Sequence, residues 1–149
     1  MAKYELEESA EAETDFCNFL HEQIKEFNNV ISPHHQAARP PEAITPLNII
    51  LKSGSGEILG GLSAKTYWGW LDVEDFFIPG QLRGQGLGAN ILKMAESAAI
   101  RRGCTKVHLS TFGFQAPNFY LKQGYQIVGT LEDYPPGSAF YWLKKDLLQ

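Results

Sequence analysis

The chain has 149 residues, of which 44% are hydrophobic and 20% are charged, and its formal net charge at pH 7 is −4. This length predicts one domain over 1–149 with a sizeable hydrophobic core, and the composition is typical of globular proteins. The acidic balance argues against nucleic acid or an anionic membrane as a partner, and no apolar run approaches the roughly 18 residues that cross a membrane.

Residues 1–44 predict a variable segment made of a strand, a helix and a loop. Its acidic beginning lacks the basic and then apolar pattern of a secretory signal, so we expect a cytoplasmic protein. Residues 4–7 suit a short strand. Apolar side chains at helical spacing predict a helix over 14–30, capped by Thr14 or Asp15. A loop should follow over 32–46, which contains four prolines.

Two pairs of residues in the chain invite a metal or redox interpretation. His34 and His35 are adjacent, but the other histidines lie far away in the sequence, which favours a loop pair and no metal. Cys17 and Cys104 fall in apolar-patterned segments, so we expect reduced cysteines in the core.

Residues 45–145 predict the main part of an α/β structure. Helical patterns run from residue 87 to about residue 102, where Gly103 ends the helix, and over 117–123. Because a strand, a loop, a helix and another strand follow in succession, 70–78 and 106–110 should pair in parallel. The strands predicted from alternating or apolar runs between turns are 47–51, 58–67, 70–78, 106–110, 125–131 and 139–143.

Three glycines at alternate positions separate the predicted strand 70–78 from the helix that follows it. Gly84, Gly86 and Gly88 let the backbone approach a ligand closely and adopt positive φ angles without steric cost. A helix that starts just after them presents unpaired N–H groups and its positive dipole end. The loop therefore predicts an anion site, most often one for phosphate or pyrophosphate. The absence of a following Lys-Ser/Thr pair argues against a nucleoside-triphosphate loop.

Two motifs of the chain resemble those of the GNAT superfamily of acetyl-CoA-dependent N-acetyltransferases. Residues 81–86 read Gln-Leu-Arg-Gly-Gln-Gly and match the family pattern Gln/Arg-x-x-Gly-x-Gly/Ala. Residues 120–125 read Tyr-Leu-Lys-Gln-Gly-Tyr and match a later family pattern. The resemblance covers about 45–145 and is closest to small bacterial members. One departure is Gly113, where many members carry an asparagine that contacts the coenzyme, and Gln115 is expected to replace it.

The resemblance implies a GNAT fold, with a mixed central sheet of six to seven strands and helices on both faces. It implies transfer of the acetyl group of acetyl-CoA to a primary amine of a small molecule or peptide by direct attack. It also suggests a homodimer.

The implied coenzyme site combines a loop and a strand. The pyrophosphate would bind backbone N–H groups of 83–89, and a backbone N–H near Phe77 or Ile78 would polarise the thioester carbonyl. The strand would diverge from its parallel neighbour, so that the pantetheine arm inserts like an extra strand. The coenzyme-binding residues expected are Phe76, Phe77, Ile78, Arg83, Gly84, Gln85, Gly86, Leu87, Gly88, Ala89 and Gln115.

Proton transfer needs a base for the amine and an acid for the departing thiolate. Glu74 is the candidate base, because it lies on the same strand among apolar neighbours that would desolvate it. Asp72, Asp75 and water are the alternatives. Tyr120 is the candidate acid, since a phenol remains protonated near neutral pH and can donate to a thiolate. A structural role in the core is the alternative for Tyr120.

Other functions and other roles for single residues remain open at this point. The glycine spacing also fits a loose dinucleotide fingerprint, but its position in mid-chain argues against an NAD-dependent oxidoreductase. A non-catalytic acyl-CoA-binding or sensor module would keep the loop and need no proton donor. Glu132 and Asp133 suit either attraction of a cationic acceptor or a turn. The aromatic residues that suit either the core or a pocket lining are Trp68, Trp70, Phe112 and Phe114.

Overall fold

The computed structural model describes residues 3–38 and 43–147. The chain divides into two compact units, Met1–Arg39 and Pro40–Gln149, and each is described by itself. The expectation that they form one domain stays a prediction. Residues 39–42 of the predicted loop lie outside the described residues. None of the described helices is both long enough and apolar enough to span a membrane.

The first unit contains helices α1 (Thr14–Ile31) and α2 (Pro33–Ala37). α1 confirms the helix predicted from the apolar spacing, but Glu13 occupies the N-cap and its side chain makes no capping bond, so the predicted caps are wrong. α2 lies where a loop was predicted. Its short helix is stabilised by Ser32, whose hydroxyl accepts a hydrogen bond from the backbone N–H of His35 at 3.3 Å.

Two further sequence predictions fail in the first unit. Residues 4–7 form no strand, because no other described strand pairs with them. Cys17 is exposed on α1, a helix with no buried residue, whereas Cys104 in the second unit is buried as expected.

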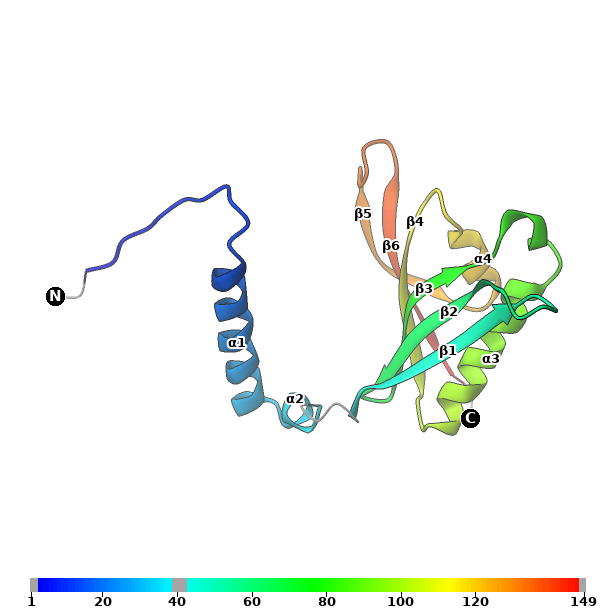
Figure 1. Ribbon diagram of the computed structural model, residues 1–149, viewed down its shortest axis with the longest axis horizontal. Coiled ribbons are helices and arrows are strands. Elements are labelled where there is room, and N and C mark those ends of the chain that lie inside the picture. Colours follow the sequence, from blue (N-terminus) through cyan, green and yellow to red (C-terminus); the bar gives the residue numbers. More distant parts are fainter. Residues whose placement is uncertain (1–2, 39–42, 148–149) are drawn as a thin grey trace. The chain divides into compact units, whose positions relative to one another are not determined.

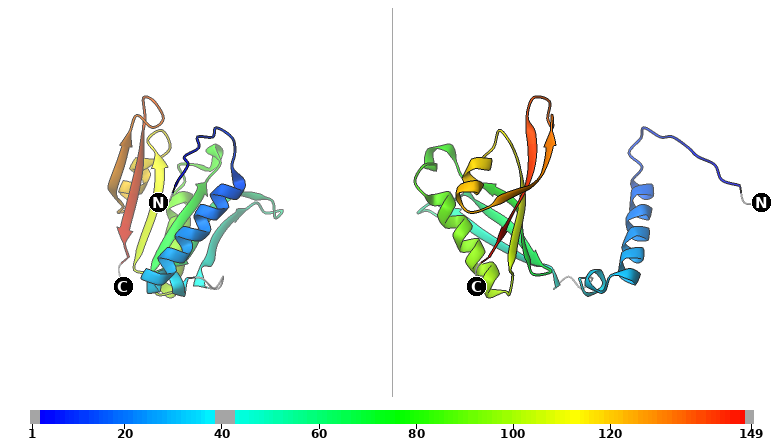
Figure 2. Two further views of the ribbon diagram at one scale, coloured as in Figure 1. Left: turned by 90° about the vertical axis from the view of Figure 1, so that its left-hand side faces the viewer. Right: turned by 180° about the vertical axis from the view of Figure 1, so that it is seen from behind.

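The second unit is built on a mixed six-stranded sheet with the order β1-β2-β3-β4-β6-β5 (Figure 1). Only the β3–β4 pair is parallel, as the sequence predicts. Seen from two further sides in Figure 2, the sheet is twisted, with β1 and β2 turned relative to β5 and β6. The strands are β1 (Thr45–Lys52), β2 (Ile58–Tyr67), β3 (Trp70–Phe77), β4 (Lys106–Phe112), β5 (Gln126–Glu132) and β6 (Ala139–Asp146). The prediction of an α/β fold with a mixed sheet of six to seven strands is confirmed.

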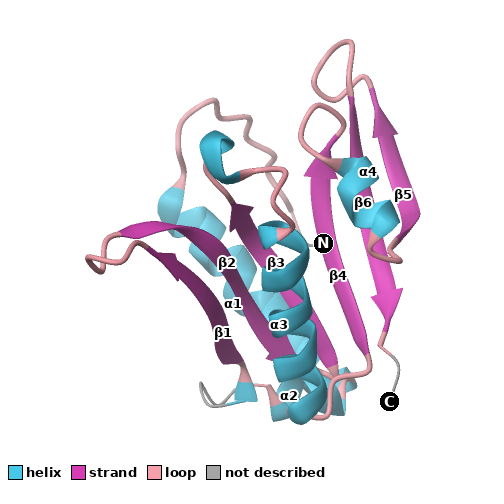
Figure 3. Ribbon diagram, turned by 90° about the vertical axis from the view of Figure 1, so that its right-hand side faces the viewer, coloured by secondary structure: helices cyan, strands magenta, loops and turns pink. Residues whose placement is uncertain are grey.

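Two helices of the second unit lie on the same face of the sheet (Figure 3). They are α3 (Leu87–Arg101), which follows β3, and α4 (Pro117–Lys122), which follows β4. α3 ends as predicted, with Gly103 in the left-handed conformation at φ 86°. Both described α-helices of the second unit lie on one face, so the expectation of helices on both faces stays a prediction.

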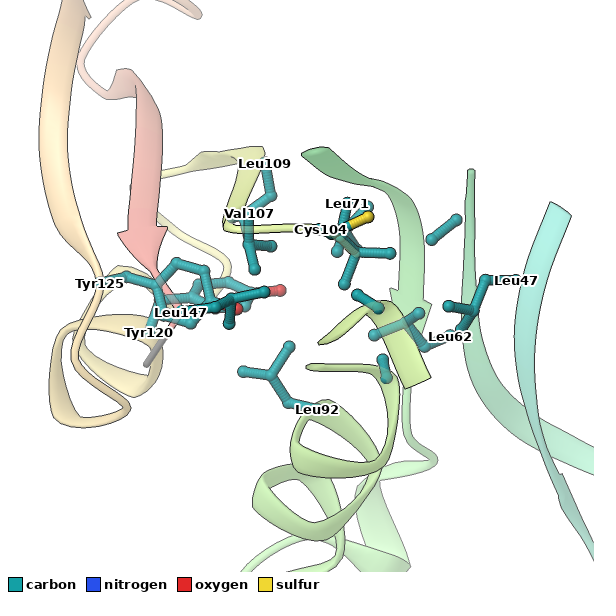
Figure 4. Packing of buried hydrophobic residues seen from close by; sticks show 14 of the residues in the cluster. Leu47, Leu62, Leu71, Leu92, Cys104, Val107, Leu109, Tyr120, Tyr125 and Leu147 are labelled. Carbon is teal, nitrogen blue, oxygen red and sulfur yellow. The ribbon is translucent and has the colours of Figure 1, made fainter. Parts of the chain in front are cut away.

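The core lies between α3 and the sheet (Figure 4). α3 is amphipathic, and its apolar stripe includes Leu92 and Ala95, which are buried. These side chains meet Leu71 of β3, Val107 of β4 and Leu143 of β6, each with no exposed surface. Burial of such side chains supplies the main stabilisation of the fold.

A buried ionic group joins α3 to the last strand. The Glu96 carboxylate accepts a hydrogen bond from the Tyr125 hydroxyl at 2.7 Å and pairs with the Lys145 ammonium at 2.9 Å. Because Tyr125 directly follows the turn after α4, this group connects α3, α4 and β6. The positions of α3 and α4 relative to each other are therefore fixed by both polar and apolar contacts.

Candidate functional site

β3 and β4 diverge soon after they pair. Their register includes only Trp70, Leu71 and Asp72 of β3, although β3 continues to Phe77 and β4 continues to Phe112. Figure 3 shows the two strands separating toward their carboxyl ends. The facing edges beyond Asp72 carry backbone N–H and C=O groups that are not used by the neighbouring strand. Such edges can hydrogen-bond an extended ligand that carries amides.

A β-bulge reorients β3 beside this gap. Ser63 of β2 pairs with Asp75, and the next residue of β2, Ala64, pairs with Val73, so Glu74 has no partner on β2. The extra residue reverses the alternation of side chains, because Val73 and Phe76 both face the core side. Bulges of this kind often redirect a side chain next to a functional site.

The glycine loop leads directly into the start of α3. Gly84 and Gly86 have φ angles of 80° and 77°, the left-handed conformation that glycine adopts most easily. Gly86 is the N-cap of α3, and the first intrahelical bond, from Asn90 N to Gly86 O, measures 3.1 Å. The N–H groups of residues 87–89 lie before the first bonded N–H and have no carbonyl partner within the helix. They are therefore available to an anion.

Arg83 adds a positive charge to the loop. Its Nε donates a hydrogen bond to the Ile78 carbonyl at 2.9 Å, and its guanidinium carbon lies 6.0 Å from the centre of the Phe77 ring. Gly88 does not adopt a positive φ angle, but its lack of a side chain lets the first turn of α3 pack closely against its neighbours. A Cβ there would lie 3.2 Å from Ile78 Cδ1 and 3.3 Å from Phe119 Cζ.

A cavity of about 920 Å³ lies between β3, the glycine loop, the carboxyl end of β4 and α4. Its volume is within the range of small-molecule sites. The cavity brings together all but one of the predicted site residues; Gln85 is not among its lining residues, and its side chain lies 3.5 Å from the Gln81 carbonyl. The predicted residues that line it are Glu74, Phe76, Phe77, Ile78, Arg83, Gly84, Gly86, Leu87, Gly88, Ala89, Gln115 and Tyr120.

Tyr120 lies on α4 and faces the cavity with little exposed surface. Only 9% of the residue is accessible, and its ring packs near those of Phe76, Phe119 and Tyr125. Burial raises the pKa of Tyr120 to about 12, and no charge or hydrogen bond among the described residues adds to that shift. The phenol therefore keeps its proton at neutral pH.

The three candidate acids of β3 have different surroundings. Glu74 and Asp75 line the cavity, whereas Asp72 does not. Asp72 accepts a hydrogen bond from the Tyr67 hydroxyl at 2.9 Å, and its carboxylate lies 3.7 Å from His108 Nε2. The apolar surroundings expected for Glu74 are not found, because its side chain is 41% exposed and lies 3.5 Å from Lys65 Nζ. At the bulge, Glu74 has no partner on β2, and its side chain is partly exposed to solvent.

Gln115 holds the end of β4 in place. Its side-chain oxygen accepts hydrogen bonds from the Phe112 backbone N–H at 2.8 Å and from the Thr111 hydroxyl at 3.1 Å. The side-chain NH₂ is not used in these bonds, and the residue lines the cavity. A contact of Gln115 with a coenzyme stays a prediction.

Sequence reasoning missed several lining residues. They include Ser110 and Thr111 of β4, Phe119 of α4, and Gln123 just after α4. The residues of β4 could have been found from topology, since ligands bind near the carboxyl ends of strands in α/β sheets. Of the four aromatic residues considered above, only Phe114 lines the cavity.

The turn after β5 clarifies one of the alternatives left open by the sequence. The Asp133 carboxylate accepts a hydrogen bond from the backbone N–H of Gly137 at 2.9 Å, and Asp133 has a φ of 59°. This is the arrangement of a turn residue, which supports the turn role for Asp133. Glu132 is the last residue of β5 and is exposed.

Comparison with known proteins agrees with this arrangement. Residues 7–125 match the acetyltransferase (GNAT) family. The chain is 34% identical over 131 residues to Blasticidin-S acetyltransferase of Streptomyces morookaense, covering 84% of this chain and 96% of that protein. The fold is similar to that of an acetyltransferase from Bacillus cereus, with a TM-score of 0.78, 24% identity and coverage of 95% and 98% of the two chains.

A more distant structure has the same fold and was solved with a ligand. It is an acetyltransferase from Bacillus anthracis str. Ames in complex with acetyl coenzyme A, with a TM-score of 0.59 and 18% identity over 76% of this chain and 67% of that chain. The family match covers most of the chain and includes both motifs up to residue 125. The chain therefore belongs to the GNAT family of acetyltransferases.

Proposed function

We propose that this acetyltransferase moves the acetyl group of acetyl-CoA to a primary amine of a small molecule by direct attack of the amine on the thioester. The observation that carries the proposal is the continuous cavity that joins the separated edges of β3 and β4 to the glycine loop. Acetyl-CoA supplies an activated acetyl group on a long arm with two amides and a pyrophosphate. Each of these chemical features has a counterpart in the cavity.

The separated strands and the loop offer backbone and side-chain groups that suit the proposed coenzyme. The backbone edge of 73–77 can pair with the amides of the arm, as an added strand would. The N–H groups at the start of α3 and the Arg83 guanidinium suit the charge of the pyrophosphate. The left-handed conformations of Gly84 and Gly86 leave open space where side chains would otherwise approach the phosphates.

The β3 backbone also supports a role in polarising the thioester. Beyond Asp72, N–H groups on the β4 side of β3 have no partner on β4. We assign one of them, near Phe77 or Ile78, to hydrogen-bond the carbonyl oxygen as negative charge develops on it. Because the group belongs to the backbone, its position is fixed by the sheet.

Tyr120 and Glu74 are assigned the two proton transfers. Tyr120 lines the cavity and its hydroxyl keeps its proton at neutral pH, so it is assigned to protonate the departing thiolate. Glu74 accepts the proton of the amine, directly or through a water. Its side chain is 41% exposed and lies 3.5 Å from Lys65 Nζ. Asp75 lines the same cavity and is the second candidate base.

The acceptor is proposed to be a small amine, and the similarity to Blasticidin-S acetyltransferase makes blasticidin S a first compound to test. The decisive experiment mixes the protein, acetyl-CoA and each member of a panel of amines and short peptides, and follows release of the coenzyme thiol. We expect thiol release that depends on the amine. Tight binding of acetyl-CoA with no release above buffer for any amine would support a non-catalytic acyl-CoA-binding module instead.

The base is tested by the pH dependence of the rate. Replacement Glu74→Gln should flatten the acid limb of the profile of kcat/KM against pH. Asp72→Asn is the matched control, because Asp72 lies on the same strand but does not line the cavity, and it should leave the profile unchanged. An acid limb that survives in Glu74→Gln and disappears in Asp75→Asn assigns the base to Asp75.

A further inference from the structure

We infer that three aromatic side chains beside the cavity form a stacking surface for a planar unsaturated ring carried by the amine acceptor. The three are Phe112, Phe114 and Tyr134, called here the aromatic platform. The inference rests on the proposed function, because it assigns the class of acceptor that the same site takes.

The rings of the platform are nearly parallel. Phe112 and Phe114 have centroids 5.2 Å apart and an interplanar angle of 10°, and Phe112 and Tyr134 are 6.1 Å apart at 21°. The ring of Phe140 on β6 packs at a steep angle against two of the three rings, at 4.8 Å and 64° from Phe112 and at 5.7 Å and 79° from Tyr134. The three rings therefore present flat faces with one common orientation.

The platform is accessible and continuous with the site. Phe114 is 67% exposed and Tyr134 is 53% exposed, which is costly for large rings that have no ligand. Phe114 also lines the cavity, next to Gln115 in the sequence. A molecule that rests on Phe114 can therefore extend a short chain with an amine toward the carboxyl ends of β3 and β4.

Hydrogen bonds of the backbone hold the platform in place before any ligand arrives. The N–H of Gly113 donates to the Ala139 carbonyl at 2.7 Å, which ties the β4–α4 loop to the start of β6. Gln115 fixes the other side of the loop through the Phe112 N–H at 2.8 Å. The Tyr134 N–H donates to the Ser138 carbonyl at 3.3 Å. A surface fixed in this way loses little conformational freedom when a ligand binds.

Gly113 connects the platform to the departure from the family motif. A Cβ at this position would lie 3.4 Å from the Ala139 carbonyl oxygen and 3.4 Å from the Tyr141 ring, so the loop approaches the β5–β6 turn closely. That approach brings Phe112 and Phe114 next to Tyr134. Through its backbone bond to the Ala139 carbonyl, Gly113 thus takes part in building a surface for the acceptor side of the cavity.

Parallel exposed rings favour a planar π-system over an aliphatic group of the same size. Aromatic groups stack in offset parallel arrangements, and stacking of a base on an aromatic side chain changes affinity by about 10-fold or more. A saturated ring gains hydrophobic burial on the same surface but no stacking. The difference between the two kinds of ring therefore isolates the platform's contribution.

The test compares 2-phenylethylamine with 2-cyclohexylethylamine, which share the amine and the chain length. We expect kcat/KM for thiol release to be about 10-fold higher with the phenyl compound. Phe114→Leu, which keeps an apolar side chain and removes the ring, should reduce the preference to less than about 2-fold, and Tyr134→Leu should reduce it in part. Trp68→Leu is the matched control. It removes an exposed aromatic ring in the β2–β3 turn, outside the cavity, and should leave the preference unchanged.

Equal kcat/KM values for the two amines in the wild-type protein overturn the inference, as does a preference that survives in both Phe114→Leu and Tyr134→Leu. If neither amine is acetylated, the two compounds are titrated calorimetrically into protein saturated with coenzyme A. An affinity about 10-fold higher for the phenyl compound then supports the platform although amine acetylation fails. Equal affinities overturn the platform as well.

Discussion

Tyr120 shows how the environment of one side chain determines its chemistry. Its phenol is surrounded by the rings of Phe76, Phe119 and Tyr125, and burial raises its pKa to about 12. A group with such a pKa is a weak acid toward water at neutral pH. It can donate only to a base that forms close beside it, and the departing thiolate is the base proposed here.

We therefore predict that Tyr120→Phe lowers kcat by about 10²- to 10⁴-fold and leaves KM nearly unchanged, because the hydrogen bond strengthens only as the thiolate forms. The measurement is steady-state thiol release under conditions in which chemistry limits turnover. Tyr67→Phe is the control, since Tyr67 has a pKa that burial and Asp72 raise to about 12 but lies outside the cavity. Near-normal kcat in Tyr120→Phe would assign Tyr120 to the core.

The same pKa predicts a loss of stability in alkaline solution. The unfolded phenol releases its proton near pH 10 and the folded one near pH 12, so the contribution of Tyr120 is complete below pH 10 and is lost between pH 10 and 12. Two pKa units correspond to about 2.7 kcal/mol. Urea unfolding at a series of pH values should show that Tyr120→Phe loses less stability over this interval than the wild type. Parallel curves for the two proteins would contradict the shift.

Among the elements, the start of α3 carries the most specific backbone geometry. Two left-handed glycines precede the helix, and a third glycine, Gly88, lets its first turn pack against Ile78 and Phe119. The N–H groups that result point out of the helix end toward the cavity. Their direction depends on the φ angle of Gly86, which any other residue adopts only at a cost of about 1–2 kcal/mol.

We predict that Gly86→Ala weakens binding of coenzyme A by about 10-fold or more, since relief of the strain would turn the N–H groups away from the phosphates. Gly103→Ala at the other end of α3 is a matched control. Gly103 has a φ of 86°, close to the 77° of Gly86, and a Cβ at either position meets no other atom within 4 Å. Both variants should lose similar stability, and only Gly86→Ala should lose affinity in calorimetry. Equal dissociation constants for the two variants would argue against the anion site.

The elements also show which features a sequence reveals. The helix end at Gly103 and the parallel order of β3 and β4 could be predicted, because they depend on a local φ requirement and on chain order. The bulge at Glu74 could not, since it is a property of the register between two strands. For that reason the apolar surroundings predicted for Glu74 were wrong. Tyr120 and the loop glycines, which were chosen from local motifs, do line the cavity.

The sheet of the second unit consists of two antiparallel halves, β1-β2-β3 and β4-β6-β5, which join along one short parallel pairing between β3 and β4. Within each half, the strands pair over most of their length. The cavity lies where the halves separate, and α3 and α4 cover the same face of both. Binding of a ligand in the cavity should therefore affect groups on both halves.

Hydrogen exchange can test this arrangement. We predict that coenzyme A slows the exchange of backbone amides in 73–77 and in 109–112 that face the gap, because the arm of the coenzyme pairs with them. Amides between β1 and β2 are the internal control, and their exchange should change only through the overall gain in stability. Slowed exchange confined to 83–89 would mean that the arm does not lie between the strands.

The short join between the half-sheets also has a mechanical meaning. If the two outer strands were pulled apart across the sheet, the load would concentrate on the parallel pairing at Trp70, Leu71 and Asp72, because the antiparallel pairings on either side are longer. A coenzyme arm hydrogen-bonded to the facing edges of both β3 and β4 would hold the two half-sheets together beyond this pairing. The bound coenzyme would then also stabilise the sheet. Its release and rebinding in each turnover would remove and restore that stabilisation.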